Sequence, residues 1–362
     1  MTLFDKDSRS ALQAREHAQW IAFAPTVFHA ARALRDSRIL ELVERCGASG
    51  MQLPRIAQES GLSEYAARVL VEAGLGIGLL TLQNECYALT KTGWFVLHDA
   101  MTRANMDFSN DVTYHGMADL HSALLTGRPQ GLRRLGDWST VYEGLAHLPE
   151  HVRRSWLAFD HYYSDVAFPA ALPLVLRHRP RRLMDIGGNT GRFASRCLQS
   201  DPRIEITIVD LPGQLDMARS ALDAVEGCER VRYHAADMLD PQSALPEGHD
   251  AIWVSQFLDC FSEAQVVSIL KRCASALAPE GRIFVLEPLW DRQTSTAAAF
   301  CLQQTSLYFT ALANGSSRMY TSDVLTALVR QAGLEVTEQT DGIGVAHTLL
   351  VCQPVHRQDE SC

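Results

Sequence analysis

A glycine-rich loop follows an apolar run near the middle of the chain. The stretch LMDIGGNTGRF, residues 183–193, has the pattern of a strand end, a tight loop and the start of a helix. Glycines allow the backbone to approach a ligand closely, and the free amides at a helix start attract polar or anionic groups. The pattern predicts a nucleotide-type cofactor site, although nicotinamide-dependent dehydrogenases use a similar loop.

Two more acids follow apolar runs at regular spacing after this loop. Asp210 ends IEITIVD, and Asp237 follows VRYHAA. The carboxyl ends of parallel strands meet at one edge of a sheet, where Asp210 could accept hydrogen bonds from ribose hydroxyls and Asp237 could read an adenine amino group. Three unrelated acids at strand ends are the alternative explanation, and the regular spacing favours the cofactor crevice.

A further acid lies at the end of the apolar run VSQFLDCFSE, where burial would work against its charge. This acid is Asp259, and a surface loop is the simple alternative to a catalytic pocket. Glu287, in VLEP, ends a later strand-like run. Burial and mutual repulsion would raise the pKa of Asp259, and a hydrogen bond between the two acids would share one proton.

The order of the elements predicts where these residues meet. From residue 181 onward, short apolar strands alternate with helical spacers, which is typical of an α/β, Rossmann-like doubly wound sheet. The first hundred residues are mainly helical and have a winged-helix pattern. Its second helix offers only Arg68 against Glu64 and Glu72, so DNA binding is disfavoured and dimerisation is expected. We therefore expect domains at 1–100 and 181–355, joined by a helical connector at 101–180.

Composition excludes several classes of protein. The chain has 362 residues, 47% hydrophobic and 21% charged, and a net charge of -9, which suits a globular protein and not a general nucleic-acid binder. Its nine cysteines include no C-x-x-C pair, and no membrane span or signal peptide is evident, so a cytoplasmic location is expected. HLPEH, residues 147–151, has the letters of a zinc motif, but Pro149 would disrupt the helix it needs, so no metal is expected.

These motifs together resemble the class I S-adenosylmethionine-dependent methyltransferases, in particular the small-molecule O-methyltransferase family with an N-terminal winged-helix dimerisation domain. The resemblance rests on DIGGNTG, VDLP, ADML and LKRCASALAPEGRIFVLEP. It implies S-adenosylmethionine as cofactor, a homodimer, and an aromatic acceptor bound between the domains. The implied cofactor-binding residues are Asp185, Gly187, Gly188, Asn189, Gly191, Asp210, Leu211, Asp237, Met238 and Ser255.

The chain departs from this family at the residues expected to do the chemistry. Family members read roughly A-I-F-M-K-W-I-C-H-D-W where this chain reads AIWVSQFLDCF, so Asp259 replaces the histidine that serves as general base. Glu287 matches the first acid that orients that histidine, whereas the second becomes a serine at 317. In the cofactor loop, Asn189 replaces a usual glycine, and asparagine tolerates left-handed backbone angles.

The expected acceptor is a small phenol, free or attached to a carrier protein. Asp259 and Glu287 could accept a phenolic proton, or Asp259 could remove the proton that a ring carbon loses after methylation. SQFLDCFS, EPLWDRQ and SLYFTALANG are also similar to a bacterial subgroup associated with aryl-polyene pigments. A non-methylating enzyme and a cofactor-sensing winged-helix regulator are the alternatives. Candidate pocket residues, which could equally belong to the core, are His161, Tyr162, Trp290, Phe300, Tyr308 and Phe309.

Overall fold

The computed structural model describes residues 4 and 6–355 and separates into two compact units, with the boundary between Ser109 and Asn110. The compact units have this one boundary between them. The domain boundaries at residues 100 and 180 stay predictions from the sequence. None of the described helices combines the length and apolar character needed to cross a membrane.

The N-terminal unit is a set of helices around a small three-stranded sheet of order β1-β3-β2. The turn between α3 and α4 passes through Gly61 at φ +73°, and Ser63 caps α4 by accepting a hydrogen bond from the Ala66 amide. The predicted helix pair and hairpin are thus present. The elements are α1 (Ala11–Asp36), α2 (Ile39–Arg45), β1 (Met51–Gln52), α3 (Leu53–Ser60), α4 (Glu64–Gly76), β2 (Leu80–Gln83), β3 (Cys86–Leu89), α5 (Lys91–His98) and α6 (Ala100–Phe108).

The C-terminal unit is built on a sheet that has seven strands within the described residues, in the order β6-β5-β4-β7-β8-β10-β9. Neighbouring strands from β6 to β8 are parallel, and β10 is antiparallel to both β8 and β9. The strand order reverses at β4 and β7, so a crevice is expected beyond their carboxyl ends. The strands are β4 (Arg182–Ile186), β5 (Glu205–Asp210), β6 (Val231–Ala235), β7 (His249–Ser255), β8 (Leu277–Pro288), β9 (Leu334–Ile343) and β10 (His347–Pro354).

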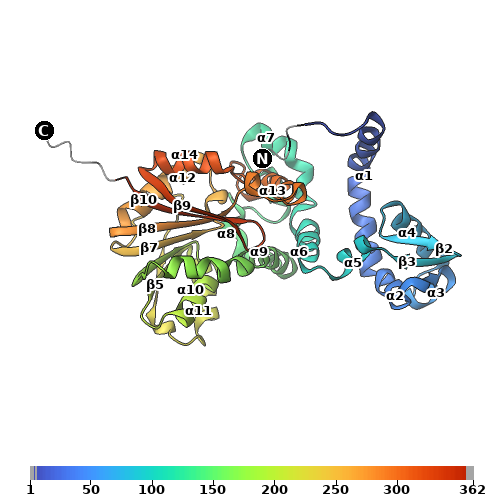
Figure 1. Ribbon diagram of the computed structural model, residues 1–362, viewed down its shortest axis with the longest axis horizontal. Helices are drawn as coiled ribbons and strands as arrows, with labels where there is room; N and C mark the ends of the chain where they lie inside the picture. Colours follow the sequence, from blue (N-terminus) through green and yellow to red (C-terminus); the bar gives the residue numbers. More distant parts are fainter. Residues whose placement is uncertain (1–3, 5, 356–362) are drawn as a thin grey trace. The chain divides into compact units, whose positions relative to one another are not determined.

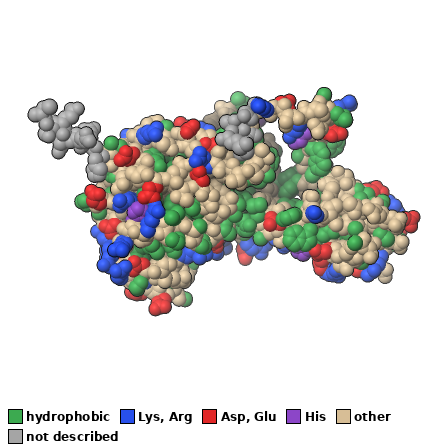
Figure 2. All heavy atoms as spheres, viewed as in Figure 1, with side chains coloured by type: hydrophobic (Ala, Val, Ile, Leu, Met, Phe, Trp, Pro, Cys, Tyr) green, Lys and Arg blue, Asp and Glu red, His purple; other side chains and the backbone are tan. Residues whose placement is uncertain are grey.

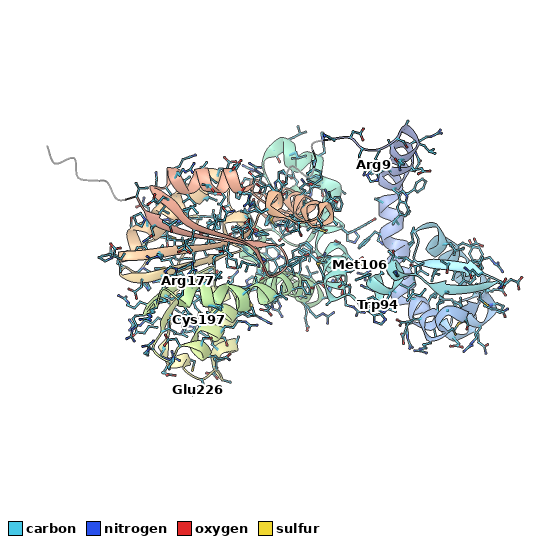
Figure 3. The ribbon with its side chains drawn as sticks, in the orientation of Figure 1. Arg9, Trp94, Met106, Arg177, Cys197 and Glu226 are labelled. Atoms are coloured by element: carbon cyan, nitrogen blue, oxygen red, sulfur yellow. The ribbon has the colours of Figure 1, made fainter. Side chains whose placement is uncertain are left out.

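Helices cover both faces of this sheet, which confirms the predicted doubly wound α/β class. One core joins α12 and α14 to the sheet, and a second joins α9, α10 and α11 to its other face (Figure 1). In the second core Phe193 stacks on Trp253 with ring centroids 4.0 Å apart, and Cys197, labelled on α10 in Figure 3, is fully buried. The helices of this unit are α7 (Leu120–Thr126), α8 (Val141–Gly144), α9 (Glu150–Leu176), α10 (Arg192–Ser200), α11 (Pro212–Leu222), α12 (Glu263–Ala276), α13 (Thr296–Tyr308) and α14 (Ser322–Gln331).

The long helix α9 links the core to the glycine loop. Its second half packs into the core through Ala167, Phe168 and Val175. Its first half carries Asp160 and His161, which bond to the loop between β4 and α10. The sheet and α9 therefore fix the loop from two sides.

Candidate active site

The glycine loop adopts a shape that other residues would not allow. Gly187 has φ +71° and Gly191 has φ +73°, in the left-handed region that glycine adopts without steric cost. A Cβ on Gly187 would overlap the Phe257 ring, and one on Gly191 would lie 2.7 Å from a methyl carbon of Leu222. The loop backbone is thus pressed against its neighbours, and its bare surface is left for a ligand.

Two acids, Asp185, which is buried, and Asp210, which is half-buried, lie next to this loop. Asp210 accepts hydrogen bonds from the amides of Asn189 at 2.9 Å and Leu211 at 2.8 Å, and burial raises its pKa to about 6. Burial, followed by the charge of Asp210, raises the pKa of Asp185 to about 7, and its Oδ2 has no partner among the described residues. A buried carboxylate oxygen without a partner costs free energy unless a ligand satisfies it. This acid therefore fits a cofactor that brings hydrogen-bond donors.

The other predicted cofactor residues lie along the same edge of the sheet. Ser255 ends β7, and its buried Oγ has no hydrogen-bond partner in the described part of the chain. Beyond β6, Met238 is buried and Asp237 is exposed, with its Oδ1 accepting from the Leu239 amide at 2.8 Å. The ends of β4, β5, β6 and β7 thus bring the predicted cofactor residues to one crevice edge.

Asp259 is buried, but it does not end a strand as the sequence suggested. β7 stops at Ser255, because Gln256 takes a left-handed φ of +49° and turns the chain. Asp259 then lies in a short 3-10 turn, Leu258–Cys260, with 5% of its surface exposed. The surface-loop alternative is therefore excluded, and the expectation of a strand that continues to this acid is wrong.

Three side chains from separate elements hold this turn. The Oε1 atom of Glu287, on β8, accepts hydrogen bonds from the amides of Phe257 at 2.9 Å and Leu258 at 2.8 Å. Asn314 Nδ2 donates to the Cys260 carbonyl at 2.6 Å. The Tyr320 hydroxyl donates to the Phe261 carbonyl at 2.5 Å. The position of the acid is thus fixed through its backbone.

The expected hydrogen bond between Asp259 and Glu287 is absent. Glu287 uses Oε1 for the two amides, and its Oε2 has no partner within the described residues. Burial and then the charge of Asp259 raise the pKa of Glu287 well above its usual range. Burial, opposed by a hydrogen bond from the Cys260 thiol, raises the pKa of Asp259 to about 7, and the charge of Asp160 adds to this. The two acids interact through their charges, and Asp259 can exchange a proton near neutral pH.

The sequence did not reveal the contact of Asp160 with the glycine loop, nor the contact between Asn314 and Ser317. Asp160 on α9 accepts a hydrogen bond from Asn189 Nδ2 at 3.2 Å, and burial raises its pKa to about 6. Ser317, which stands where relatives have a second acid, is buried and accepts from Asn314 Nδ2 at 2.8 Å. The only signal for Asp160 was the unusual asparagine in the loop, and nothing in the sequence named its partner.

The aromatic candidates separate into two groups. Tyr308 and Phe309 are buried and adjacent, and the Tyr308 hydroxyl accepts a hydrogen bond from Trp156 Nε1 at 2.8 Å. Burial raises the pKa of Tyr308, and the charges of Cys260, Asp160 and Asp259 add to this. Tyr308 therefore remains a candidate wall of the acceptor site.

The remaining candidates are more scattered. His161 bonds through Nε2 to Thr190 Oγ1 at 3.1 Å, and burial lowers its pKa to about 4, so it is neutral at pH 7. Tyr162 and Trp290 are half-buried, whereas Phe300 is 56% exposed. His161 thus contacts the cofactor loop, and Phe300 does not wall a pocket within its own unit.

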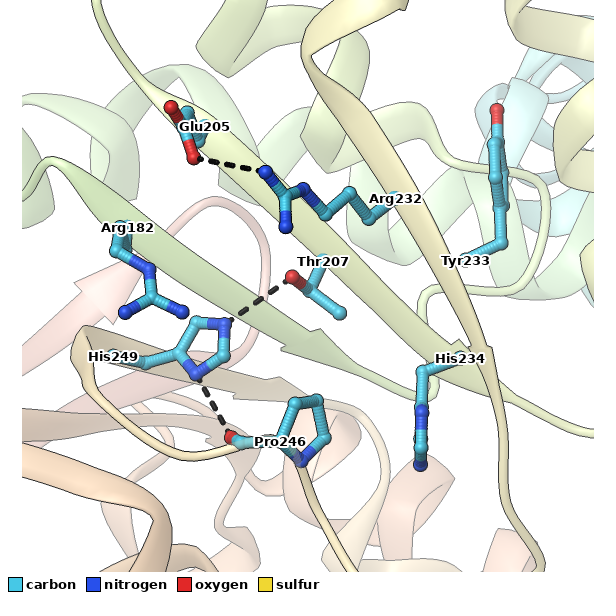
Figure 4. Close-up of a pocket in the computed structure, with 8 residues that line it drawn as sticks. All are labelled: Arg182, Glu205, Thr207, Arg232, Tyr233, His234, Pro246 and His249. Atoms are coloured by element: carbon cyan, nitrogen blue, oxygen red, sulfur yellow. Dashed lines mark hydrogen bonds and ion pairs between the residues drawn. The ribbon is translucent and has the colours of Figure 1, made fainter.

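A separate pocket lies at the opposite edge of the sheet, at the starts of β4 to β7 (Figure 4). Its polar groups are already paired: His249 bonds to Thr207 Oγ1 at 3.2 Å and to the Pro246 carbonyl at 3.0 Å, and Arg232 lies 3.8 Å from Glu205. This pocket is therefore distinct from the crevice that holds the predicted site.

The strand order, the glycine loop at the point where that order reverses, and the strand-end acids define a Rossmann-like methyltransferase. Residues 161–335 match the family described as the O-methyltransferase domain, and residues 15–87 match the Dimerisation2-like domain. The chain thus carries an O-methyltransferase domain and a dimerisation domain, and it is an S-adenosylmethionine-dependent methyltransferase, as the sequence motifs predicted.

Curated relatives differ in the reaction they catalyse. L-tyrosine C(3)-methyltransferase of Streptomyces lavendulae is 22% identical over 322 residues, 88% of this chain and 86% of the relative. Aclacinomycin 10-hydroxylase RdmB of Streptomyces purpurascens is 27% identical over 320 residues, covering 86% and 83%. Among solved structures, an O-methyltransferase from neocarzinostatin biosynthesis, in complex with S-adenosylmethionine and 2-hydroxy-5-methyl naphthoic acid, has a TM-score of 0.69, 20% identity and coverage of 91% and 96%. The similarity to this solved structure supports the fold described above.

Proposed function

We propose that this enzyme methylates a small phenolic acceptor on the ring carbon next to its hydroxyl, with Asp259 as the proton acceptor. The observation that carries the proposal is the buried Asp259, held by its backbone at the crevice and with a pKa raised to about 7. A residue whose pKa lies near the working pH is well suited to acid–base catalysis. The name of the Streptomyces lavendulae relative, which refers to a ring carbon of tyrosine, supports this choice.

The chain's own residues divide the work between the cofactor and the acceptor. Asp185, Asp210 and the glycine loop would hold S-adenosylmethionine, because they offer an unpartnered buried carboxylate oxygen and a half-buried loop backbone beside it. When bound, this cofactor supplies an electrophilic methyl group and becomes the neutral thioether S-adenosylhomocysteine. Glu287 holds the turn through the amides of Phe257 and Leu258, and burial raises the pKa of Asp259 in that turn.

The proton balance favours ring carbon over oxygen. An ordinary phenol has a pKa of about 10, and that of Asp259 is about 7. Transfer of the phenol proton to the Asp259 carboxylate therefore costs roughly 4 kcal/mol, at about 1.4 kcal/mol per pKa unit. A methylated ring carbon that still bears its hydrogen loses that proton readily, because the ring becomes aromatic again. Asp259 takes this one proton while the new carbon–carbon bond stays, and the phenol hydroxyl is regained. A weak carboxylate base is sufficient for that step.

A second candidate is an enzyme of the same fold that binds the cofactor without transferring its methyl group. The similarity to aclacinomycin 10-hydroxylase RdmB over 86% of this chain supports this second candidate, because the name of that relative refers to a hydroxylase. The loss of the family histidine at residue 259 is also consistent with changed chemistry. This alternative predicts cofactor binding with no S-adenosylhomocysteine produced.

We also propose that the enzyme is a homodimer. The Dimerisation2-like match covers residues 15–87, and large apolar side chains are exposed on α1, including Trp20, Ile21 and Phe23 (Figure 2). Exposed apolar clusters of this kind mark contact surfaces. Light scattering coupled to gel filtration should give a mass near twice 40.1 kDa, and a mass of one chain would contradict the proposal.

Methyl-labelled S-adenosylmethionine provides the decisive experiment. The enzyme is incubated with this cofactor and an extract of cells that lack the protein, and labelled products are examined by NMR. A label on an aromatic carbon supports the proposal, and a label on oxygen replaces it with O-methylation. No labelled product, with cofactor binding shown by calorimetry, supports the non-methylating alternative.

A further inference from the structure

Asn189, in the glycine loop, bonds to acids on two other elements, through its side chain to one and through its backbone amide to the other. Its φ of +49° is left-handed, a conformation that costs free energy for residues with a side chain. Its Nδ2 donates to Asp160 Oδ2 on α9 at 3.2 Å, and its backbone amide donates to Asp210 Oδ2 at 2.9 Å. A single residue thus connects an acid on α9 to an acid predicted to bind the cofactor ribose.

A second hydrogen bond lies beside this one. We call the two contacts between α9 and the loop, Asp160 with Asn189 and His161 with Thr190, the seam. Thr190 Oγ1 lies 3.1 Å from His161 Nε2, so two consecutive residues of the loop bond to two consecutive residues of the helix. Arg192, at the start of α10, pairs with Asp165 on the same helix. Because α9 is anchored in the core by its second half, the seam can transmit that rigidity to the loop.

The Asp160 carboxyl is the strongest member of this seam. It is half-buried, and a hydrogen bond to an ionised group is worth more than one between neutral groups. If the Asn189 side chain lost this partner, nothing in the described contacts of that side chain would favour its left-handed backbone, since its Oδ1 has no hydrogen bond. The Asn189 amide would then turn away from Asp210, and Asp210 would lose one of its two backbone donors.

We propose that Asp160 is a positioning residue for the cofactor: it holds Asn189 in the left-handed conformation, and Asn189 in turn orients Asp210. A glycine at position 189 would adopt the left-handed backbone without support, whereas Asn189 is held in it by its hydrogen bond to Asp160. The inference concerns binding of the cofactor and does not depend on which atom of the acceptor receives the methyl group.

Calorimetric titration with S-adenosylhomocysteine tests this pair without any turnover. Asp160→Ala should weaken binding about tenfold, the equivalent of about 1.4 kcal/mol, which lies within the range of a hydrogen bond to a charged group. Asp160→Asn should stay within about threefold of the wild type, because an amide oxygen can still accept from Asn189. Asp216→Ala, which removes an exposed acid on α11, is the matched control and should bind normally.

A double substitution separates this mechanism from a general loss of stability. Glycine needs no side-chain support in the left-handed region, so Asn189→Gly should bind well, and adding Asp160→Ala to it should cause little further loss. Equal losses from Asp160→Ala in both backgrounds, or no loss in either, would overturn the proposal.

A further comparison at position 189 keeps the test valid if Asp160→Ala does not fold. Asn189→Ala keeps the backbone cost but removes the side chain, so it should bind about tenfold more weakly than Asn189→Gly. Equal affinity of these two variants would contradict the pairing. Melting temperatures measured alongside confirm that each variant is folded. A failure to methylate any acceptor would affect the proposed function and leave these binding results unchanged.

Discussion

Asp259→Asn should make the enzyme slower and, above neutral pH, more stable. The acid is buried and has its pKa raised from 3.8 to about 7, so the folded state binds a proton more tightly than the unfolded state does. Between these two pKa values, stability falls as pH rises, because the unfolded chain releases its proton first. A neutral amide of similar shape does not have this dependence.

The size of the effect follows from the same shift. A difference of about 3 units corresponds to at most about 4 kcal/mol at pH values above 7, and the coupling to Glu287 makes this an upper bound. For a unit of this size, each kcal/mol moves the melting temperature by about 2–4 °C. Turnover should fall about 100-fold or more, the scale of lost acid–base catalysis, with unchanged cofactor affinity.

Melting curves from pH 4 to pH 9, with and without the substitution, provide the assay. The two proteins should melt together near pH 4, diverge as pH rises from about 4 to about 7 and keep a constant difference above that, with the variant higher. Asp323→Asn, at an exposed acid on α14, is the control and should show no such divergence. A variant that melts lower than the wild type at pH 9, or that turns over normally, would refute the reasoning about this acid.

The remaining predictions concern the residues around that acid. Glu287→Gln keeps an oxygen for the two amides, and the pKa of Asp259 is raised by burial and by the charge of Asp160, so the pH at which the rate is half-maximal should stay close to that of the wild type; a clear fall in that pH would show that a charge on Glu287 acts on Asp259. Asn314→Ala removes a bond to the Cys260 carbonyl and should lower kcat about tenfold with little change in KM, which steady-state kinetics would reveal; loss of cofactor binding instead would place Asn314 in a different function. Gly187→Ala forces a Cβ into the Phe257 ring and into a left-handed backbone, so it should destabilise the protein by about 1–3 kcal/mol and weaken cofactor binding in calorimetry; normal binding would mean that the loop moves freely.

The sequence predicted the fold well because its signals are local. The alternation of strands and helices depends on residues close together in the chain, and the glycine loop and Asp210 lie at strand ends that the α/β class brings to one edge. The same reasoning placed Asp259 at the crevice. It extended the strand too far, because the left-handed conformation of Gln256 has no signature that distinguishes it from an ordinary strand residue.

The support of the site could not be predicted in the same way. Asn314 and Tyr320 hold the turn from residues more than fifty positions later, and Asp160 bonds to a loop 29 positions away. Hydrogen bonds between distant residues have no periodicity in the sequence. The expected bond between Asp259 and Glu287 was wrong for a related reason: Glu287 Oε1 bonds to the backbone amides of Phe257 and Leu258, and Oε2 has no partner among the described residues.

The turn that holds Asp259 also has a consequence for synthesis of the chain on the ribosome. Its restraints come from Glu287, Asn314 and Tyr320, all of which leave the ribosome after Asp259 itself. A nascent chain that ends before residue 320 can form the cofactor edge of the sheet but cannot complete this turn. Until then the acid stays hydrated, with the proton affinity of an ordinary aspartate. The turn that holds the proposed proton acceptor is thus complete only once residue 320 has been made.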